Sequence, residues 1–249
     1  RGCPYQCSFC ATSRFWDNIH RSKDVSQTVE EIRTAIEDTG IRKYEITHDQ
    51  FTKSKQKVRD FCSEISNLDI IWGCRTRIDT VDRETIDLME KAGCRSMFIG
   101  IDSGSQKVLR RINKGISLER ADKLVRYIEE ETNISTITSF ITGFPFERID
   151  DLGKTFRKIS LYRDYGSRTS VNVLKPFRGT ELYQNYKDRL LFDRYFYEKN
   201  NIVLEEKEIK MIDDNPHLFS GHCRISPKFF SAYFIEAITA AYNFLNSVA

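Results

Sequence analysis

The chain has 249 residues, 40% of them hydrophobic and 30% charged, with a formal net charge of +3. This composition supplies enough apolar material for one large domain and excludes a disordered chain. Lysines and arginines are scattered among acids, so the sequence indicates no nucleic-acid-binding face. Seven cysteines, an odd number, argue against a disulfide framework. With no signal peptide and no membrane span in the pattern, we expect a cytoplasmic protein.

Helices and strands alternate along the chain. Strands are predicted over residues 43–47, from residue 70, and over residues 96–101, 135–141 and 170–174. Helices are predicted between Asp24 and Gly40, over residues 54–65, between Asp82 and Gly93, from Ser117, and over residues 152–162. Such alternation predicts parallel strands with crossover helices, in either a doubly wound sheet or a barrel.

The pattern changes after Tyr183. Residues 183–215 are charged and aromatic, and we expect them to be irregular over the end of the barrel, with residues 197–214 helping to shape a substrate pocket. An amphipathic helix follows over residues 226–248. We expect it to pack on the barrel through the stripe Phe230, Phe234, Ile238 and Leu245.

Three cysteines crowd the start of the chain, at Cys3, Cys7 and Cys10. Three thiolates on one loop can wrap one small metal centre, and thiolates are the usual ligands of iron–sulfur clusters. A cubane cluster has four irons, so three ligands leave one iron open to a small molecule. A structural zinc site would need a fourth ligand, and the nearest candidate, His20, has no partner motif.

This C-x3-C-x2-C spacing, with the aromatic Phe9 before the last cysteine, resembles the radical S-adenosylmethionine (SAM) superfamily. The resemblance implies that Cys3, Cys7 and Cys10 ligate a [4Fe-4S] cluster whose fourth iron binds SAM. It implies reductive cleavage of SAM to a 5′-deoxyadenosyl radical that abstracts hydrogen from a substrate. It also implies a partial (β/α)6 barrel with parallel strands, whose first strand precedes Arg1 and is largely missing here.

The resemblance extends over residues 1–185 through motifs at the ends of the predicted strands. These are Thr47–Thr52, Arg75–Asp79 (an R-x-D), Gly100–Ser105, Thr142–Glu147 (a G-x-P-x-E) and Lys175–Tyr183. It implies that the SAM contacts are Phe9, Asp49, Arg77, Asp102, Ser103, Gly143, Pro145 and Glu147. Parallel α/β barrels place their sites at these strand ends. Taken singly, Gly143 reads equally as a turn glycine, Asp102 as a helix cap and Arg77 as a surface ion pair.

The other cysteines have simpler interpretations. Cys62, Cys74 and Cys94 lie among apolar neighbours and are predicted to be core thiols. Cys223 is also considered as a hydrogen-atom donor. No catalytic side chain beyond the cluster ligands is predicted.

The sequence from Cys10 to Trp16, with residues 25–32, is similar to radical SAM proteins that carry an N-terminal cobalamin-binding domain. That similarity implies methyl transfer to, or another modification of, a peptide or natural product, with cobalamin bound outside this chain. We therefore expect a radical SAM core over residues 1–185, a C-terminal extension over residues 186–249 and a missing upstream domain. The expected partners are a small-molecule or peptide substrate and an electron donor such as flavodoxin or ferredoxin.

Two alternatives remain open from the sequence. One is a cobalamin-independent radical SAM enzyme, either a peptide maturase or an RNA methylthiotransferase-like protein, although the Phe-rich C-terminal end does not suggest an RNA-binding barrel. The other is a non-catalytic iron–sulfur or zinc-binding module. A structural site needs no apparatus for SAM, so the motifs at the strand ends weigh against the second alternative.

Overall fold

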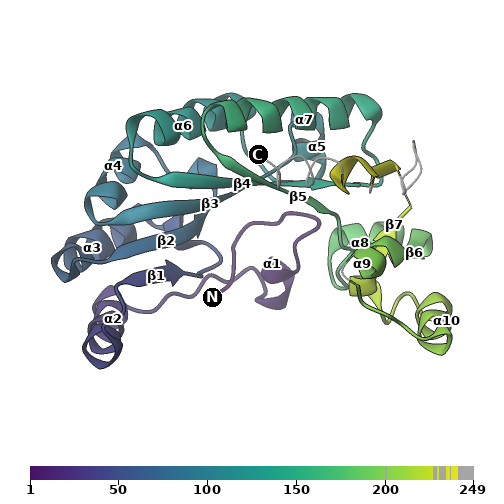
Figure 1. Cartoon of the computed structure of the whole chain (residues 1–249), viewed down its shortest axis with the longest axis horizontal. Helices are drawn as coiled ribbons and strands as arrows, with labels where there is room; N and C mark the ends of the chain where they lie inside the picture. The colour runs from purple at the N-terminus through teal and green to yellow at the C-terminus, as the bar shows by residue number, and fades with distance from the viewer. Residues whose placement is uncertain (200, 227–228, 230–233, 236, 241–249) are drawn as a thin grey trace.

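A five-stranded parallel sheet forms the centre of the molecule (Figure 1). The computed structural model describes residues 1–199, 201–226, 229, 234–235 and 237–240. The strands are β1 (Lys43–Ile46), β2 (Ile71–Thr76), β3 (Cys94–Asp102), β4 (Ser135–Thr142) and β5 (Arg168–Val173). Their order in the sheet follows the sequence, and every neighbouring pair is parallel. Because the order never reverses, the sheet is the wall of a partial barrel and not a doubly wound sheet.

The helices between the strands cover one face of this sheet. In Figure 1, α4, α6 and α7 run along one side of the strands, and the N-terminal segment with α1 lies on the other. The helices up to β5 are α1 (Ala11–Phe15), α2 (Val25–Thr39), α3 (Lys55–Ile65), α4 (Arg83–Lys91), α5 (Gln106–Arg111), α6 (Leu118–Glu131) and α7 (Ile149–Asp164), with the 3-10 turns Phe51–Lys53, Ser66–Leu68 and Ile78–Thr80. The side chains of Asp82 and Ser117 cap α4 and α6 as predicted. Asp24 stands at the start of α2 without a side-chain capping bond.

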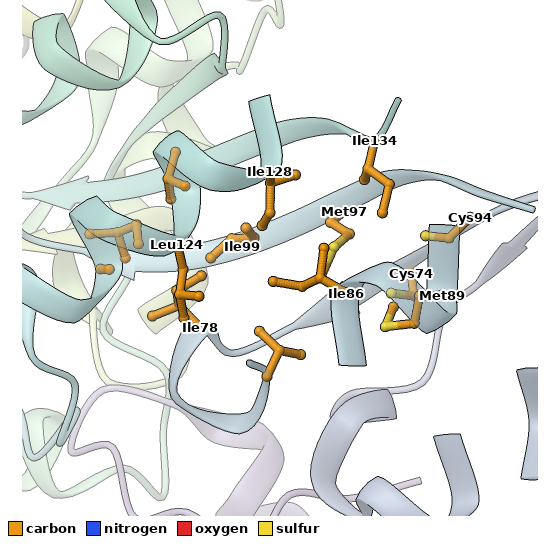
Figure 2. Close-up of a cluster of buried hydrophobic side chains, with 14 of the residues drawn as sticks. Cys74, Ile78, Ile86, Met89, Cys94, Met97, Ile99, Leu124, Ile128 and Ile134 are labelled. Atoms are coloured by element: carbon orange, nitrogen blue, oxygen red, sulfur yellow. The ribbon is translucent and has the colours of Figure 1, made fainter. Parts of the chain in front are cut away.

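The hydrophobic core lies between the sheet and these helices (Figure 2). Met97 and Ile99 alternate along β3 with partly exposed residues, so both side chains point to the helix-covered face. There they join Ile86 and Met89 of α4 and Leu124 of α6, all buried. Each such side chain contributes about 1.5–3 kcal/mol to folding. The opposite face of the sheet is thereby left for the N-terminal loop.

The chain after β5 is more regular than predicted. Instead of irregular structure, residues 181–214 contain α8 (Glu181–Tyr186), the 3-10 turn Lys187–Arg189, β6 (Leu190–Phe192), α9 (Arg194–Lys199) and α10 (Glu206–Asp214). The 3-10 turn Ser220–His222 and β7 (Cys223–Ile225) follow, and β7 pairs antiparallel with β6. A capping box between Glu205 and Glu208 stabilises the start of α10, which explains how so charged a segment forms a helix.

The predicted C-terminal helix is described only in part. Phe230 and Leu245 lie outside the described residues, and residues 234–235 and 237–240 are helical. Phe234 is 39% exposed and Ile238 is partly exposed, whereas Ile235 and Thr239 are buried, so the two described residues of the predicted stripe do not form the buried side. The hydroxyls of Thr239 and Thr142 lie 3.2 Å apart, which places this helix against the end of β4. Within the described residues, no helix has the length and apolar character needed to cross a bilayer.

Candidate active site

One loop carries all three N-terminal cysteines. Residues 1–10, here called the cysteine loop, precede α1, and Cys3, Cys7 and Cys10 are each half-buried in it. The amide of Cys10 donates to the carbonyl of Cys7 over 3.1 Å, which forms the tight turn between these two residues. Ser8 fixes the loop to the rest of the molecule, because its amide donates to the carbonyl of Ile112 and its carbonyl accepts from the amide of Leu182, each over 2.9 Å.

Electrostatic interactions link the three thiols of the cysteine loop. Within the described part of the chain, no three His, Cys, Asp or Glu side chains stand close enough to hold a single metal ion. Cys10 nevertheless lies within electrostatic range of both Cys3 and Cys7. A cubane presents its irons at separate corners, so its ligands lie farther apart than those of one ion. Three thiols without a fourth ligand therefore fit a cluster that keeps one iron open.

Arg77 lies against the cysteine loop at the end of β2. Its guanidinium makes a bidentate pair with Asp79, at 3.0 and 2.9 Å, and donates to Cys7 Sγ over 3.6 Å. The ring of Tyr5 lies over the same guanidinium, 3.8 Å away. Arg77 is only 6% exposed, so it is not the surface ion pair considered from the sequence. Tyr5 was not predicted as part of the site.

A second buried cation, Lys114, lies beside the same loop. Its Nζ contacts Asp102 Oδ2 at 2.6 Å, and both side chains are more than nine-tenths buried. Asp102 ends β3 with a φ of 68°, a left-handed conformation that Asp tolerates better than most residues. Sequence reasoning missed Lys114, because it follows α5 in a turn with no motif and only the fold brings it to the strand ends.

These cations oppose the effect of burial on the thiols. Burial raises the pKa of Cys7, and the nearby charges of Lys114 and Arg77 act in the opposite direction. Burial likewise raises the pKa of Cys3, and the same two cations again counteract it. Positive charge beside thiolates favours their ionised, metal-binding form. Burial still outweighs the two cations at both thiols, so their pKa values remain raised, and the cations reduce this shift.

Asp49 reaches the start of the cysteine loop. The amide of Gly2 donates to Asp49 Oδ2 over 3.0 Å. The rings of His48 and His20 lie 4.8 Å apart beside it. Asp49 itself is exposed, so its carboxylate is accessible from solvent.

The Thr142–Glu147 motif after β4 is held by a hydrogen bond between its own residues. Gly143 has a φ of 87°, and its amide donates to Glu147 Oε2 over 2.9 Å. Pro145, which lies between these two residues in the sequence, is buried. The ring of Phe144 meets Phe9 of the cysteine loop edge-on at 5.8 Å. Burial raises the pKa of Glu147 to about 8. This motif thus supports the cysteine loop through an aromatic contact, while the Glu147 carboxyl is turned toward backbone amides.

Ser103 is directed to the other side of the sheet. Its hydroxyl lies 3.3 Å from that of Thr155 in α7, and its side chain is fully buried there. A Cβ on the neighbouring Gly104 would lie 2.5 Å from the backbone of α7, so only glycine permits this close approach. The structure therefore does not bring the Ser103 hydroxyl together with the cysteines.

A cavity lies between the cysteine loop and the end of the sheet. It has a volume of about 500 Å³, and we call it the β4–β5 cavity. It is lined by residues 9–12, Ser139, Ile141, residues 172–175 and Phe177. Phe140 packs on Tyr162 of α7, so the flanking Ser139 and Ile141 point to the opposite face, into this cavity. The volume suits a ligand of drug size beside Cys10.

The remaining cysteines lie away from this cavity. Cys62, Cys74 and Cys94 are all buried in the core, as predicted. Cys223 is fully buried, its thiol contacts the carbonyl of Pro216 at 3.8 Å, and burial raises its pKa to about 11. It does not line the β4–β5 cavity.

Comparison with known proteins identifies relatives of this chain. Residues 1–159 match the family model of the radical SAM superfamily. An uncharacterized methyltransferase of Pyrococcus horikoshii is 30% identical over 189 residues, which are 74% of this chain and 40% of that protein. An anaerobic magnesium-protoporphyrin IX monomethyl ester cyclase of Rubrivivax gelatinosus is 27% identical over 209 residues, which are 82% of this chain and 36% of that protein.

A solved structure shares the fold. It is the radical S-adenosylmethionine methyltransferase TsrM from Kitasatospora setae, with cobalamin and a [4Fe-4S] cluster bound. The TM-score is 0.65 at 19% sequence identity, and the match covers 77% of this chain and 40% of that protein. The chain thus spans two-fifths or less of the length of each of these three proteins.

Proposed function

The chain belongs to the radical SAM superfamily of enzymes, and from its site we propose that it uses a [4Fe-4S] cluster and SAM to modify an organic substrate by methyl transfer. Cys3, Cys7 and Cys10 are the proposed cluster ligands. When bound, the cluster supplies the electron that cleaves SAM to methionine and a 5′-deoxyadenosyl radical. The observation that carries this proposal is the cysteine loop itself, held beside two buried cations and the β4–β5 cavity.

We propose roles at this site for the chain's own charged residues. Arg77 and Lys114 place positive charge next to the thiolates, and their partners Asp79 and Asp102 fix both cations in position. Asp49 is exposed beside the start of the cysteine loop, and its carboxylate is suited to bind the amino group of SAM.

The β4–β5 cavity has the proposed task of excluding water from the reacting groups. Its lining is largely apolar and meets the cysteine loop at Phe9 and Cys10. The ring of Phe144 packs edge-on against the ring of Phe9. The apolar lining protects reactive species from side reactions with solvent.

We further infer a division of the chain into a core over residues 1–185 and an extension over residues 186–249. The extension packs on the core through the ion pair of Asp193 with Lys175 and through the contact of Thr239 with Thr142. We also infer that cobalamin takes part and is bound by a domain outside this chain; in support, the TsrM structure, of which the match covers 40%, has cobalamin bound. The reaction also needs an external reductant such as flavodoxin or ferredoxin.

The test is anaerobic reconstitution with iron and sulfide, followed by incubation with SAM and a reductant. We expect four irons per chain, from the ligand count of a cubane cluster, and formation of 5′-deoxyadenosine and methionine. A protein that binds the cluster but never cleaves SAM would contradict the proposed chemistry.

Methyl transfer has its own test in the full-length protein. SAM with a deuterated methyl group should deliver the label to a substrate only when cobalamin is present. Label found exclusively in methionine and unreacted SAM, despite turnover of a substrate, would overturn the methyl-transfer part and leave the radical chemistry standing.

A further inference from the structure

Among the described residues, the lining of the β4–β5 cavity contains one charged side chain. Lys175 is that residue. The rest of the lining is apolar or neutral, from Phe9, Cys10, Ala11, Thr12, Ser139, Ile141, Asn172, Val173, Leu174 and Phe177. A single charge in a largely apolar pocket fixes the orientation of a ligand and selects its charge.

The fold holds Lys175 in place at the end of β5. The amide of the preceding Leu174 still donates to the carbonyl of Thr142 over 2.9 Å, so the backbone remains in register with β4 up to this point. The ammonium of Lys175 is paired with the carboxylate of Asp193, from the segment after β6. The two side chains are 21% and 5% exposed. An ammonium can donate three hydrogen bonds, so a ligand anion can share it with Asp193.

Resting on the proposed function, we propose that the substrate is an apolar molecule with one anionic group, a carboxylate or a phosphoryl group, and that Lys175 binds this anion in the β4–β5 cavity. The apolar body then lies along Ile141 and Val173, next to Phe9 and Cys10. Asp193 pairs with the ammonium and offsets its positive charge, so it limits the affinity for anions. A partly buried cation attracts an anion more strongly than a cation in bulk water does.

The test uses two ligands of equal shape and different charge, 1-naphthylacetate and 1-naphthylacetamide. Their affinities are measured by equilibrium dialysis against the reconstituted protein without SAM. The wild type should bind the acetate more tightly. Lys175→Met should weaken the acetate by about tenfold, which corresponds to about 1.4 kcal/mol, and leave the acetamide unchanged.

Asp193→Asn and a matched control separate an anion site from a structural ion pair. Asp193→Asn should increase the affinity for the acetate, because a competing negative charge is removed. If the ion pair were purely structural, Asp193→Asn and Lys175→Met would both lower that affinity. Lys158→Met is the control, since Lys158 is a partly buried lysine paired with Asp122 on the helix-covered side and lies outside the cavity. It should change neither affinity.

Three results would overturn this inference. They are equal wild-type affinities for the two ligands, a weaker acetate in Asp193→Asn, and a Lys175→Met variant that loses affinity for SAM and not for the acetate. The last result would assign the anion to the carboxylate of SAM. Because dialysis needs no SAM cleavage, failure of the proposed radical chemistry would be seen separately.

Discussion

The chain contains two groups of three cysteines, and their surroundings differ. Cys62 of α3, Cys74 of β2 and Cys94 of β3 belong to one cluster of buried apolar side chains. Figure 2 shows Cys74 and Cys94 within it. Burial raises the pKa of Cys62 to about 12, and a hydrogen bond with Cys94, together with burial, raises that of Cys74. Among the described residues, the largest effects on these two thiols come from burial and from neighbouring thiols, with Glu45 also acting on Cys74.

The thiols of the cysteine loop have the opposite setting. Cys3, Cys7 and Cys10 are half-buried, and the charges of Arg77 and Lys114 act on Cys3 and Cys7. The thiols of the core pack against apolar neighbours. The cysteine loop instead borders buried ion pairs, whose desolvation costs free energy. Such a cost is expected where a protein must hold a charged group.

The largest expected effect is that of Cys7→Ala. This variant should lose the cluster and reduce 5′-deoxyadenosine formation to the background, because one of three thiolate ligands is gone. Iron content and product analysis measure both. Cys62→Ala is the matched control and should keep both, at a loss of about 1 kcal/mol in the free energy of unfolding. If Cys7→Ala and Cys62→Ala both fold and lose the cluster to a similar extent, the proposed distinction between the two groups of cysteines is wrong.

The buried pair at the strand ends gives the next effect. Lys114→Met should lower the free energy of unfolding by about 3–5 kcal/mol, because Asp102 is then left charged and buried without its partner. The double variant with Asp102→Asn should regain most of that loss. Denaturant unfolding of the single and double variants measures the coupling, and simple additivity of the two losses would contradict a direct ion pair.

Glu147 provides a pH-dependent difference between the regions. Its pKa rises on folding from about 4.5 to about 8, so folding favours its protonated form. Between these values, rising pH should lower the stability of the wild type relative to Glu147→Gln, by up to about 1.4 kcal/mol per pH unit. Unfolding curves of both proteins across that range give the slope. Parallel curves would show that Glu147 is ionised in the folded protein.

The smallest effect is expected in the core. Ile99→Val removes one buried methyl group from β3 and should cost about 0.5–1.5 kcal/mol of stability. SAM cleavage at a temperature where the variant stays folded should match the wild type, because Ile99 faces the helices and not the cysteine loop. A clear loss of cleavage, measured with the variant fully folded, would mean that the two faces of the sheet are coupled.

Local sequence signals were sufficient for the five strands and for α2, α3, α4, α6 and α7, whereas α1 and α5 were not predicted. The alternation along β3 and the caps at Asp82 and Ser117 are encoded within a few residues, and the structure follows them. The β6–β7 pair was not predictable in this way, because it joins Leu190 to Ile225 and depends on contacts far apart in sequence. The segment before α10 had a local signal in the capping box, which its high charge obscured.

The same limit applies to the candidate site. Strand-end motifs brought Arg77 and Asp102 to the cysteine loop, because carboxyl ends of parallel strands converge. They could not show that Lys114 and Tyr5 join them, since these contacts arise only from tertiary packing. They also could not show which face of the sheet receives the Ser103 side chain, since β3 changes register near its end.

The most direct test of the central claim is the Mössbauer spectrum of protein reconstituted with isotopically enriched iron, recorded with and without SAM. A cluster held by only Cys3, Cys7 and Cys10 has one iron without a protein ligand. We predict that SAM changes the signal of one iron in four and leaves the other three unchanged. A spectrum of four equivalent irons that SAM does not alter would contradict the account.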